Sequence, residues 1–325
     1  MKVHILDDWF DTLRGLPCFE MLEGHDVTVW TDHEPDPERL AERVAEAEAL
    51  VLFRERTKIG APLLERLPNL QLVSQRSVYP HIDVEACSAN DVLLCSNMHS
   101  GTPSYAAAEL TLGLILASYR QIPDQVASIR LGGWQMGVGR TLRGRTLGLY
   151  GYGRIAKAVA GYAKAMGMRV QWWSSEDGRA RAAADGETVA ESREAFFATS
   201  DVVSVHVRLK PATRGIITAT DLAQLQDRAL FVNTSRSGLV ESGALEAAIK
   251  DGRIFAAVDV FDQEPLRDVS NPLLTHPNVM PTPHIGYVTE DEFDLQFTDI
   301  FEQVNAYASG APIHMINPDV WERSA

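Results

Sequence analysis

The stretch LGLYGYGRIA at residues 147–156 decides the fold of this chain. A short apolar run ends in the pattern Gly151-x-Gly153-x-x-Ala156, and apolar residues at helical spacing follow directly. A strand, a tight glycine turn and a helix in this order place a pyrophosphate on backbone N–H groups at the start of the helix. Gly151 permits the turn, Gly153 lets the backbone approach the phosphates, and Ala156 is small enough for the helix to pack on the strand.

The segment that follows this turn bears on which dinucleotide is bound. Arg154 and Ile155 begin the predicted helix and are the expected phosphate contacts. NAD-binding folds place an acidic residue about 20 residues after the first glycine, where it holds the ribose 2′-OH. Ser174 occupies this place, with Glu and Asp after it and then Arg179. Because a serine accepts a hydroxyl or a phosphate, the sequence leaves NAD and NADP as open alternatives.

Length and charge restrict the class of protein. A chain of 325 residues is too long for one average domain, so two domains are expected. The formal net charge of −14 argues against a nucleic acid or an anionic membrane as partner, because both need a positive surface. The sequence has no run of 18 apolar residues and begins without an apolar signal segment, so neither a membrane span nor secretion is predicted.

The cysteines and histidines point away from disulfides and metals. Cys18, Cys87 and Cys95 are odd in number and lack CxxC spacing, so neither a disulfide framework nor a zinc site is expected. The nine histidines are scattered along the chain, so we predict that it has no metal site. A reducing cytoplasm is the expected location.

Short β-branched runs alternate with helical segments along the chain, which predicts parallel sheets covered by helices. The first series of predicted strands comprises residues 3–6, 27–30, 49–53, 70–74 and 92–96. The second series comprises residues 146–150, 169–173, 202–207, 230–233, 256–261 and 279–281. Six strands with intervening helices match a full dinucleotide-binding domain. Helices are predicted over residues 37–48, over the apolar stretch 104–119 and near 290–308.

Three later segments carry a family resemblance. They read NTSRSGLVE at 233–241, DVFDQEPL at 259–266 and PTPHIG at 281–286. Together with the glycine turn, and in this order, they strongly resemble the D-isomer-specific 2-hydroxyacid dehydrogenase family. The resemblance extends over nearly the whole chain.

This resemblance implies an α/β protein with two doubly wound parallel-sheet domains. A Rossmann-type dinucleotide-binding domain, residues 101–287, would be inserted into a flavodoxin-like substrate domain made of residues 1–100 and 288–325. The coenzyme would be NAD or NADP, and the substrate a small 2-keto or 2-hydroxy acid. The family also implies a homodimer, with the long helix and the Trp134 region at the subunit contact.

The same motifs imply the catalytic residues. Reduction of a 2-keto acid needs a hydride, a proton for the new hydroxyl and a hold on the carboxylate. By the family motif, Arg236 binds the carboxylate and polarises the keto oxygen, as a planar guanidinium can. His284 transfers the proton, and Glu264 favours the charged imidazolium and orients it.

Further contacts are implied on both sides of the reaction. Thr234, Asp259 and His206 are expected near the coenzyme, with Asp259 on the nicotinamide carboxamide. On the substrate side, the resemblance points to Arg54, Ser77 and Tyr287. The family usually has a glycine-rich turn around Ser77, and those glycines are missing here. Arg208 replaces a common proline beside the adenine, where it could stack on the base or meet a 2′-phosphate.

We therefore expect an NAD(P)-dependent oxidoreductase of CH–OH donors, similar to glyoxylate and hydroxypyruvate reductases. The alternative is a dinucleotide-sensing binding protein, similar to the C-terminal-binding corepressors, which keep these motifs. A third possibility is a dehydrogenase of another kind of substrate, such as formate, and the Glu264 carboxylate weakly disfavours it.

Overall fold

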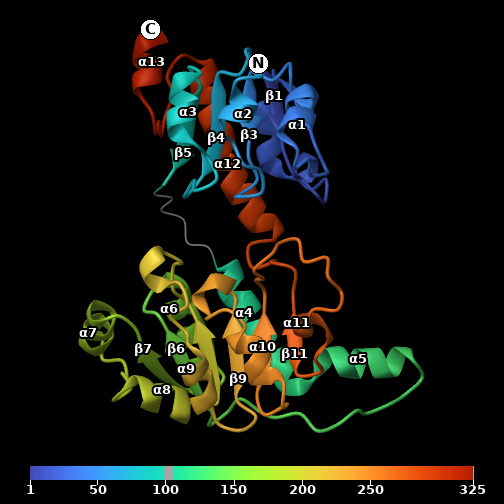
Figure 1. Cartoon of the computed structure of the whole chain (residues 1–325), viewed down its shortest axis with the longest axis vertical. Coiled ribbons are helices and arrows are strands. Elements are labelled where there is room, and N and C mark those ends of the chain that lie inside the picture. Colours follow the sequence, from blue (N-terminus) through green and yellow to red (C-terminus); the bar gives the residue numbers. More distant parts are fainter. Residues whose placement is uncertain (99–104, 325) are drawn as a thin grey trace. The chain divides into compact units, whose positions relative to one another are not determined.

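A computed structural model describes residues 1–98 and 105–324 (Figure 1). Two compact units divide the chain. The terminal unit, as we call it, contains residues 1–98 and 288–324, and the inserted unit contains residues 105–287. The predicted domain boundary between residues 100 and 101 lies outside the described residues. None of the described helices is long and apolar enough to cross a membrane.

The terminal unit is built on a five-stranded parallel sheet with helices on both faces. In spatial order the strands are β2 (Asp26–Val29), β1 (Lys2–Ile5), β3 (Ala49–Val51), β4 (Leu72–Arg76) and β5 (Leu93–Asn97). Its helical elements are η1 (Leu13–Gly15), η2 (Pro17–Leu22), α1 (Pro37–Arg43), α2 (Ala61–Leu64), α3 (Val84–Ala89), α12 (Glu290–Ala308) and α13 (Asp319–Ser324). The order 2-1-3-4-5 is the flavodoxin-like one.

Successive side chains of a strand point to opposite faces of the sheet, so each face packs against a different set of helices. Val73 packs in one core with side chains of α1, α2 and α3. Its neighbour Ser74 points to the other face, where its Oγ donates to the carbonyl of Ile300 in α12 at 2.9 Å. Gln303 of α12 donates to Ser74 Oγ and to the Gln75 carbonyl, both at 3.0 Å. Helix α12, which follows the inserted unit in the chain, therefore covers one face of a sheet made from the first hundred residues.

The inserted unit contains a six-stranded parallel sheet. In spatial order its strands are β11 (Val279–Pro281), β10 (Phe255–Val258), β9 (Leu230–Asn233), β8 (Val202–Val205), β6 (Thr146–Tyr150) and β7 (Arg169–Trp173). The strand order reverses at β6, which lies between β7 and β8, and open α/β sheets bind ligands at such a point. The two sheets confirm the predicted fold class.

Helices cover both faces of the inserted sheet (Figure 1), and an apolar core lies on each face. One face packs against α4 (Ala106–Arg120) and α6 (Arg154–Ala165). The other face packs against α8 (Arg193–Thr199), α9 (Ala219–Gln224) and α10 (Ala244–Ile249). The remaining helical elements are α5 (Ile122–Arg130), α7 (Glu176–Ala184), η3 (Pro211–Thr213), η4 (Ser237–Leu239) and α11 (Pro272–Thr275).

Element ends differ from the sequence predictions where turns intervene. The helix predicted over 37–48 ends at Arg43, because Val44 leaves the helical conformation (φ −110°, ψ 21°). The strand predicted over 70–74 begins at Leu72, because the Leu70 N–H closes a turn on the Leu67 carbonyl at 3.1 Å. Residue 104, where the long apolar helix was expected to begin, lies outside the described residues, and α4 begins at Ala106.

The packing of α12 leads to a stability prediction. Phe301 is fully buried, with its ring 5.6 Å from that of Phe297 and 6.4 Å from that of Phe19. Phe301→Ala should lower the free energy of unfolding by about 3–5 kcal/mol, because it removes buried area and leaves a cavity. Urea unfolding followed by circular dichroism measures this. The matched control is Glu302→Ala, an exposed neighbour on the same helix, which should stay within about 0.5 kcal/mol of wild type. Equal stability of the two variants would contradict this role of α12.

Candidate active site

The glycine turn after β6 has the geometry that a dinucleotide requires. Gly151 has φ +114°, and a Cβ there would lie 2.3 Å from the His206 carbonyl oxygen, so only glycine fits. Gly153 precedes α6, and a Cβ added to it would meet nothing within 4 Å. No side chain caps the N-terminus of α6. This open backbone and the uncapped N–H groups of α6, beginning at Arg154 and Ile155, fit a pyrophosphate.

His206 supports the turn from the neighbouring strand. Its N–H donates to the Tyr150 carbonyl at 2.8 Å, and its Nε2 lies 2.9 Å from Ser204 Oγ. Burial lowers the pKa of His206 to about 4, so the ring is neutral near pH 7. These contacts give His206 a structural role, and its predicted contact with the coenzyme stays a prediction.

His284 and Glu264 form a hydrogen-bonded pair in the inserted unit. His284 Nδ1 lies 2.5 Å from Glu264 Oε2, and Glu264 Oε1 accepts the N–H of Phe261 at 2.9 Å. Burial alone would raise the pKa of Glu264. The hydrogen bonds from His284 and Phe261, with the positive charges of His284 and Arg236, outweigh burial and lower it. Because Nδ1 faces the carboxylate, Nε2 is the ring atom left to exchange a proton with a substrate.

Arg236 follows β9, two strands from β11. Buried Asn233 fixes the backbone around it, since its Nδ2 donates to the Arg236 carbonyl at 2.9 Å and its Oδ1 accepts the Ser235 N–H at 3.0 Å. The guanidinium is exposed, with one N–H donated to the Ser235 carbonyl at 2.7 Å. Its charge acts on Glu264, as stated above, so the predicted Arg, Glu and His share one edge of the inserted sheet.

Asp259 is a buried carboxylate that holds the His284 segment. Its Oδ1 accepts the Thr282 hydroxyl at 2.6 Å and the Ile285 N–H at 2.9 Å, and its Oδ2 accepts the Gly286 N–H at 2.9 Å. Burial raises the pKa of Asp259 although these bonds oppose the shift. The sequence did not reveal this positioning role, and the predicted contact of Asp259 with the carboxamide stays a prediction.

Two further predicted residues have clear partners in the inserted unit. Thr234 Oγ1 lies 2.8 Å from the hydroxyl of Thr111, which ties the end of β9 to α4. The Tyr287 ring packs edge-on against His284, with 5.7 Å between centroids. Tyr287 therefore limits the space beside the imidazole, and its predicted contact with the substrate stays a prediction.

The segment after β4 shows how the chain manages without the missing glycines. Ser77 adopts the left-handed conformation (φ +76°) that a glycine would take easily. Its carbonyl accepts Gln75 Nε2 at 2.8 Å and Ser96 Oγ at 2.7 Å, and its N–H donates to the Asn97 carbonyl at 3.1 Å. Arg76 is bound to Asp299 of α12 at 2.7 Å. The N–H of Ser77 is thus already used within the terminal unit.

Arg54 and Arg56 lie at the carboxyl end of β3. Arg54 has φ +58°, and its guanidinium lies 3.6 Å from the Glu292 carboxylate. The Arg56 guanidinium stacks on Trp9, 3.9 Å from the ring centroid, and donates to the Asp7 carbonyl at 2.5 Å. Arg54 follows β3, as the sequence predicted, but the sequence did not reveal that Glu292 contacts Arg54 or that Trp9 and Asp7 contact Arg56.

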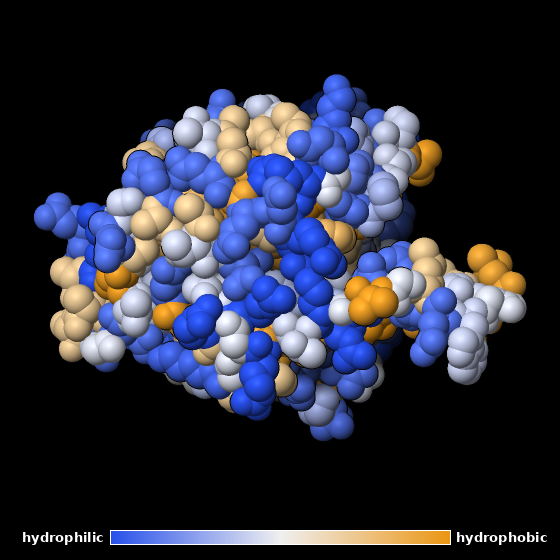
Figure 2. Space-filling view, turned by 90° about the horizontal axis from the view of Figure 1, so that it is seen from below, coloured by the Kyte–Doolittle hydropathy of each residue, from blue (hydrophilic) through white to orange (hydrophobic). Residues whose placement is uncertain are grey.

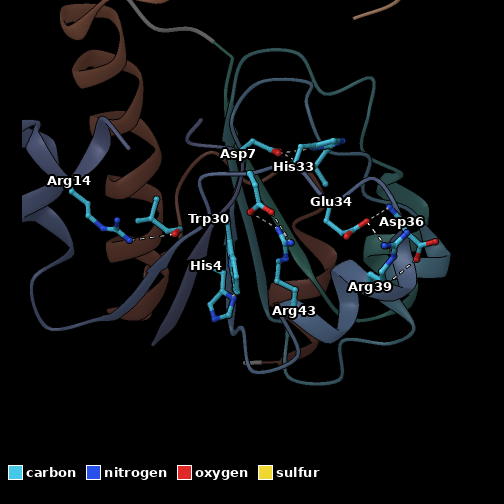
Figure 3. Close-up of polar contacts among 12 residues, drawn as sticks. His4, Asp7, Arg14, Trp30, His33, Glu34, Asp36, Arg39 and Arg43 are labelled. Atoms are coloured by element: carbon cyan, nitrogen blue, oxygen red, sulfur yellow. Dashed lines mark hydrogen bonds and ion pairs between the residues drawn. The ribbon is translucent and has the colours of Figure 1, made fainter. Parts of the chain in front are cut away.

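A second polar cluster at this edge was missed by sequence reasoning. Asp7 directly follows β1 and Leu6, has φ +63° and is buried. Its carboxylate points toward His33, 2.8 Å from Nδ1 (Figure 3), and also accepts the Thr57 hydroxyl at 2.5 Å. The one available signal was the pair of acids Asp7 and Asp8 directly after an apolar strand.

Exposed apolar side chains gather on α5 and the segment after it. Figure 2 shows hydrophobic side chains, in orange, among white and blue ones on the projecting part at the right of the view. The exposed apolar side chains of α5 and this segment are Ile122, Val126, Ile129, Leu131, Trp134, Met136 and Val138. Such a patch is typical of a protein contact surface.

No group of three or more His, Cys, Asp or Glu side chains within residues 1–98 and 105–324 is arranged to hold a metal ion. Cys18, Cys87 and Cys95 are buried, free thiols, and burial raises the pKa of each to about 12.

Fold and site together define a dinucleotide-dependent oxidoreductase. The model of the D-isomer specific 2-hydroxyacid dehydrogenase NAD-binding domain matches residues 112–286, more than half of the chain. The chain belongs to this family. The match confirms the predicted family, the oxidoreductase class and a nicotinamide dinucleotide as coenzyme.

Individual relatives agree with this assignment. A glyoxylate reductase of Aeropyrum pernix is 35% identical over 312 residues, which cover 91% of each chain. A D-3-phosphoglycerate dehydrogenase of Methanocaldococcus jannaschii is 35% identical over 84% of this chain but only 52% of its own length. The chain thus spans about half the length of that relative. The crystal structure of a putative D-3-phosphoglycerate dehydrogenase oxidoreductase from Ralstonia solanacearum is 42% identical, with a TM-score of 0.93 and coverage of 99% and 98%.

The lowered pKa of Glu264 leads to a prediction for stability against pH. A carboxylate with a folded-state pKa below its unfolded value of about 4.3 stabilises the fold above that pH, and the contribution is lost as the pH falls through the folded pKa. Glu264→Gln should therefore melt below wild type at pH 7, and the gap should shrink below pH ~4. Thermal melts from pH 3 to 7 measure it. A gap that is constant over this range would mean that the carboxylate charge does not stabilise the pair.

Proposed function

We propose that the chain reduces a small 2-keto acid to its D-2-hydroxy acid with a nicotinamide coenzyme, in the manner of a glyoxylate or hydroxypyruvate reductase. The observation that carries this proposal is the 2.5 Å contact of His284 with Glu264, beside the charge of Arg236. Relatives named glyoxylate reductase and hydroxypyruvate reductase, each aligned over about nine-tenths of both chains, support the substrate class.

The residues of the chain divide the reaction among them. The coenzyme, when bound, supplies or accepts the hydride. Glu264 holds Nδ1 of His284 and stabilises the imidazolium, so that Nε2 donates the proton to the forming hydroxyl. Arg236 binds the substrate carboxylate through its planar fork.

We propose the following contacts for the two ligands. The coenzyme is held by Gly151, Gly153, Arg154, Ile155, Ser174, His206, Thr234 and Asp259. The substrate meets Arg54, Ser77 and Tyr287 in addition to the catalytic residues. Because the Ser77 N–H is donated to Asn97, the Ser77 side chain would make its contact.

We also propose a homodimer joined through the apolar patch on α5 and the Trp134 segment. The seven exposed apolar side chains described above support it, since they would otherwise contact water. A location in the cytoplasm stays a prediction.

A spectrophotometric screen tests the function. Glyoxylate, hydroxypyruvate, pyruvate and larger keto acids are each offered with NADH and with NADPH.

His284→Ala should slow turnover of the best substrate by a factor of roughly 10²–10⁴, because the general acid is lost. Its dissociation constant for the reduced coenzyme should match wild type, which serves as the control for folding. Wild-type turnover in this variant would refute the role of His284. No turnover of any keto acid by the wild type, with coenzyme binding intact, would favour the sensor.

Arg236→Lys tests the carboxylate anchor separately. Lysine keeps the charge but loses the two-pronged geometry, so KM for the keto acid should rise at least about tenfold. Steady-state kinetics measure this change. The control is Arg214→Lys, which alters another arginine of the inserted unit, one with no assigned role in the reaction, and should leave KM as in wild type. An unchanged KM and kcat in Arg236→Lys would remove the proposed role.

A further inference from the structure

We propose that Arg179 and Ser174 form a binding site for the 2′-phosphate of the coenzyme, so that the chain selects NADP(H) over NAD(H). The inference rests on the dinucleotide site of the proposed function. It adds the chemical form of the coenzyme, which neither the motifs nor the family resolves.

The end of β7 carries no carboxylate. The strand ends at Trp173, and Ser174 follows where NAD-specific folds place the acid that binds the ribose 2′-OH. An acid at this position would also repel a 2′-phosphate. Ser174 is half-buried, and its Oγ packs over Gly178 of α7, where an added Cβ would come within 2.3 Å of it. A hydroxyl held in this way can donate to a phosphate oxygen.

Arg179 is fixed beside Ser174 by two contacts. Its guanidinium stacks on the indole of Trp173, 4.4 Å from the ring centroid, and one N–H donates to the Ser174 carbonyl at 2.6 Å. That bond uses one of the five N–H donors of the group. A planar guanidinium held by stacking loses little freedom on binding a phosphate, and its fork matches phosphate oxygens.

Nearby acids do not cancel this charge. Asp177 is paired with Arg181 at 3.0 Å, on the exposed side of α7. Glu176 is the exposed first residue of α7, where salt screens its charge over about 8 Å at physiological ionic strength. With a net charge of −14, the chain needs a local cation to bind a doubly charged group, and Arg179 supplies it.

Equilibrium binding tests the proposal without catalysis. Quenching of tryptophan fluorescence or calorimetry gives dissociation constants for NADPH and NADH, and for adenosine 2′,5′-bisphosphate and 5′-AMP. The wild type should bind NADPH about 10-fold to 100-fold more tightly than NADH, and adenosine 2′,5′-bisphosphate more tightly than 5′-AMP by a similar factor. Arg179→Ala should remove most of that ratio and change NADH affinity less than about twofold.

Two control variants sharpen the assignment. Arg169→Ala removes a cation from the opposite end of β7, so the NADPH-to-NADH ratio should stay as in wild type. Arg208→Ala removes an exposed cation in the segment after β8. Loss of the ratio in Arg208→Ala but not in Arg179→Ala would overturn the assignment to Arg179. Because each ratio is taken within one variant, a partly unfolded preparation does not distort it.

Failure of this inference differs from failure of the proposed function. Keto-acid reduction with NADH bound as tightly as NADPH would overturn the inference and leave the function in place. Tight, Arg179-dependent binding of NADPH without turnover of any keto acid would support the inference and overturn the function.

Discussion

The three hydrogen bonds to the Asp259 carboxylate are the constraint on which the arrangement of the active site depends. They tie the end of β10 to the Thr282 hydroxyl and to the backbone just after His284, and so join the ends of β10 and β11. A Cβ on Gly286 would lie 3.1 Å from Asp259 Oδ2, so the segment has little room to relax. Removing the carboxylate would leave buried donors unpaired, at a cost of ~1–3 kcal/mol for each. The position of the imidazole is thus set by a group that is itself hidden from solvent.

Four residues at strand ends share an unusual backbone conformation. Asp7, Arg54, Ser77 and His284 follow β1, β3, β4 and β11, and each has a positive φ. For residues with a Cβ this conformation costs roughly 1–3 kcal/mol and persists only where neighbouring contacts enforce it. In Ser77 the enforcing contacts are the bonds from Gln75 and Ser96, and in His284 they come from Asp259 through its neighbours. Each unit therefore has residues in this conformation at the strand ends where open α/β sheets bind ligands, although others lie elsewhere in the chain.

Sequence reasoning predicted the parts of the molecule that depend on local pattern. The turn at Gly151 and Gly153, both strand series and the pairing of His284 with Glu264 follow from spacing and motif. It could not predict contacts that depend on distant chain segments. Arg54 meets Glu292, Arg76 meets Asp299, and Asp7 meets His33 and Thr57, and no local pattern encodes such partners. Near Ser77 the family's glycines are missing, and hydrogen bonds from the Gln75 and Ser96 side chains hold Ser77 in the left-handed conformation that a glycine would adopt easily.

The discontinuity of the terminal unit has a consequence for how the chain is made. Ser74 finds its partner Ile300 226 residues later, and Asn317 binds the Leu94 N–H across 223 residues. The polypeptide leaves the ribosome from its N-terminus, so the first sheet emerges with one face bare, and the whole inserted unit is synthesised before α12 can cover it. The inserted unit holds its own cores and can mature during that interval. That face of the terminal sheet therefore stays uncovered until the inserted unit has been synthesised.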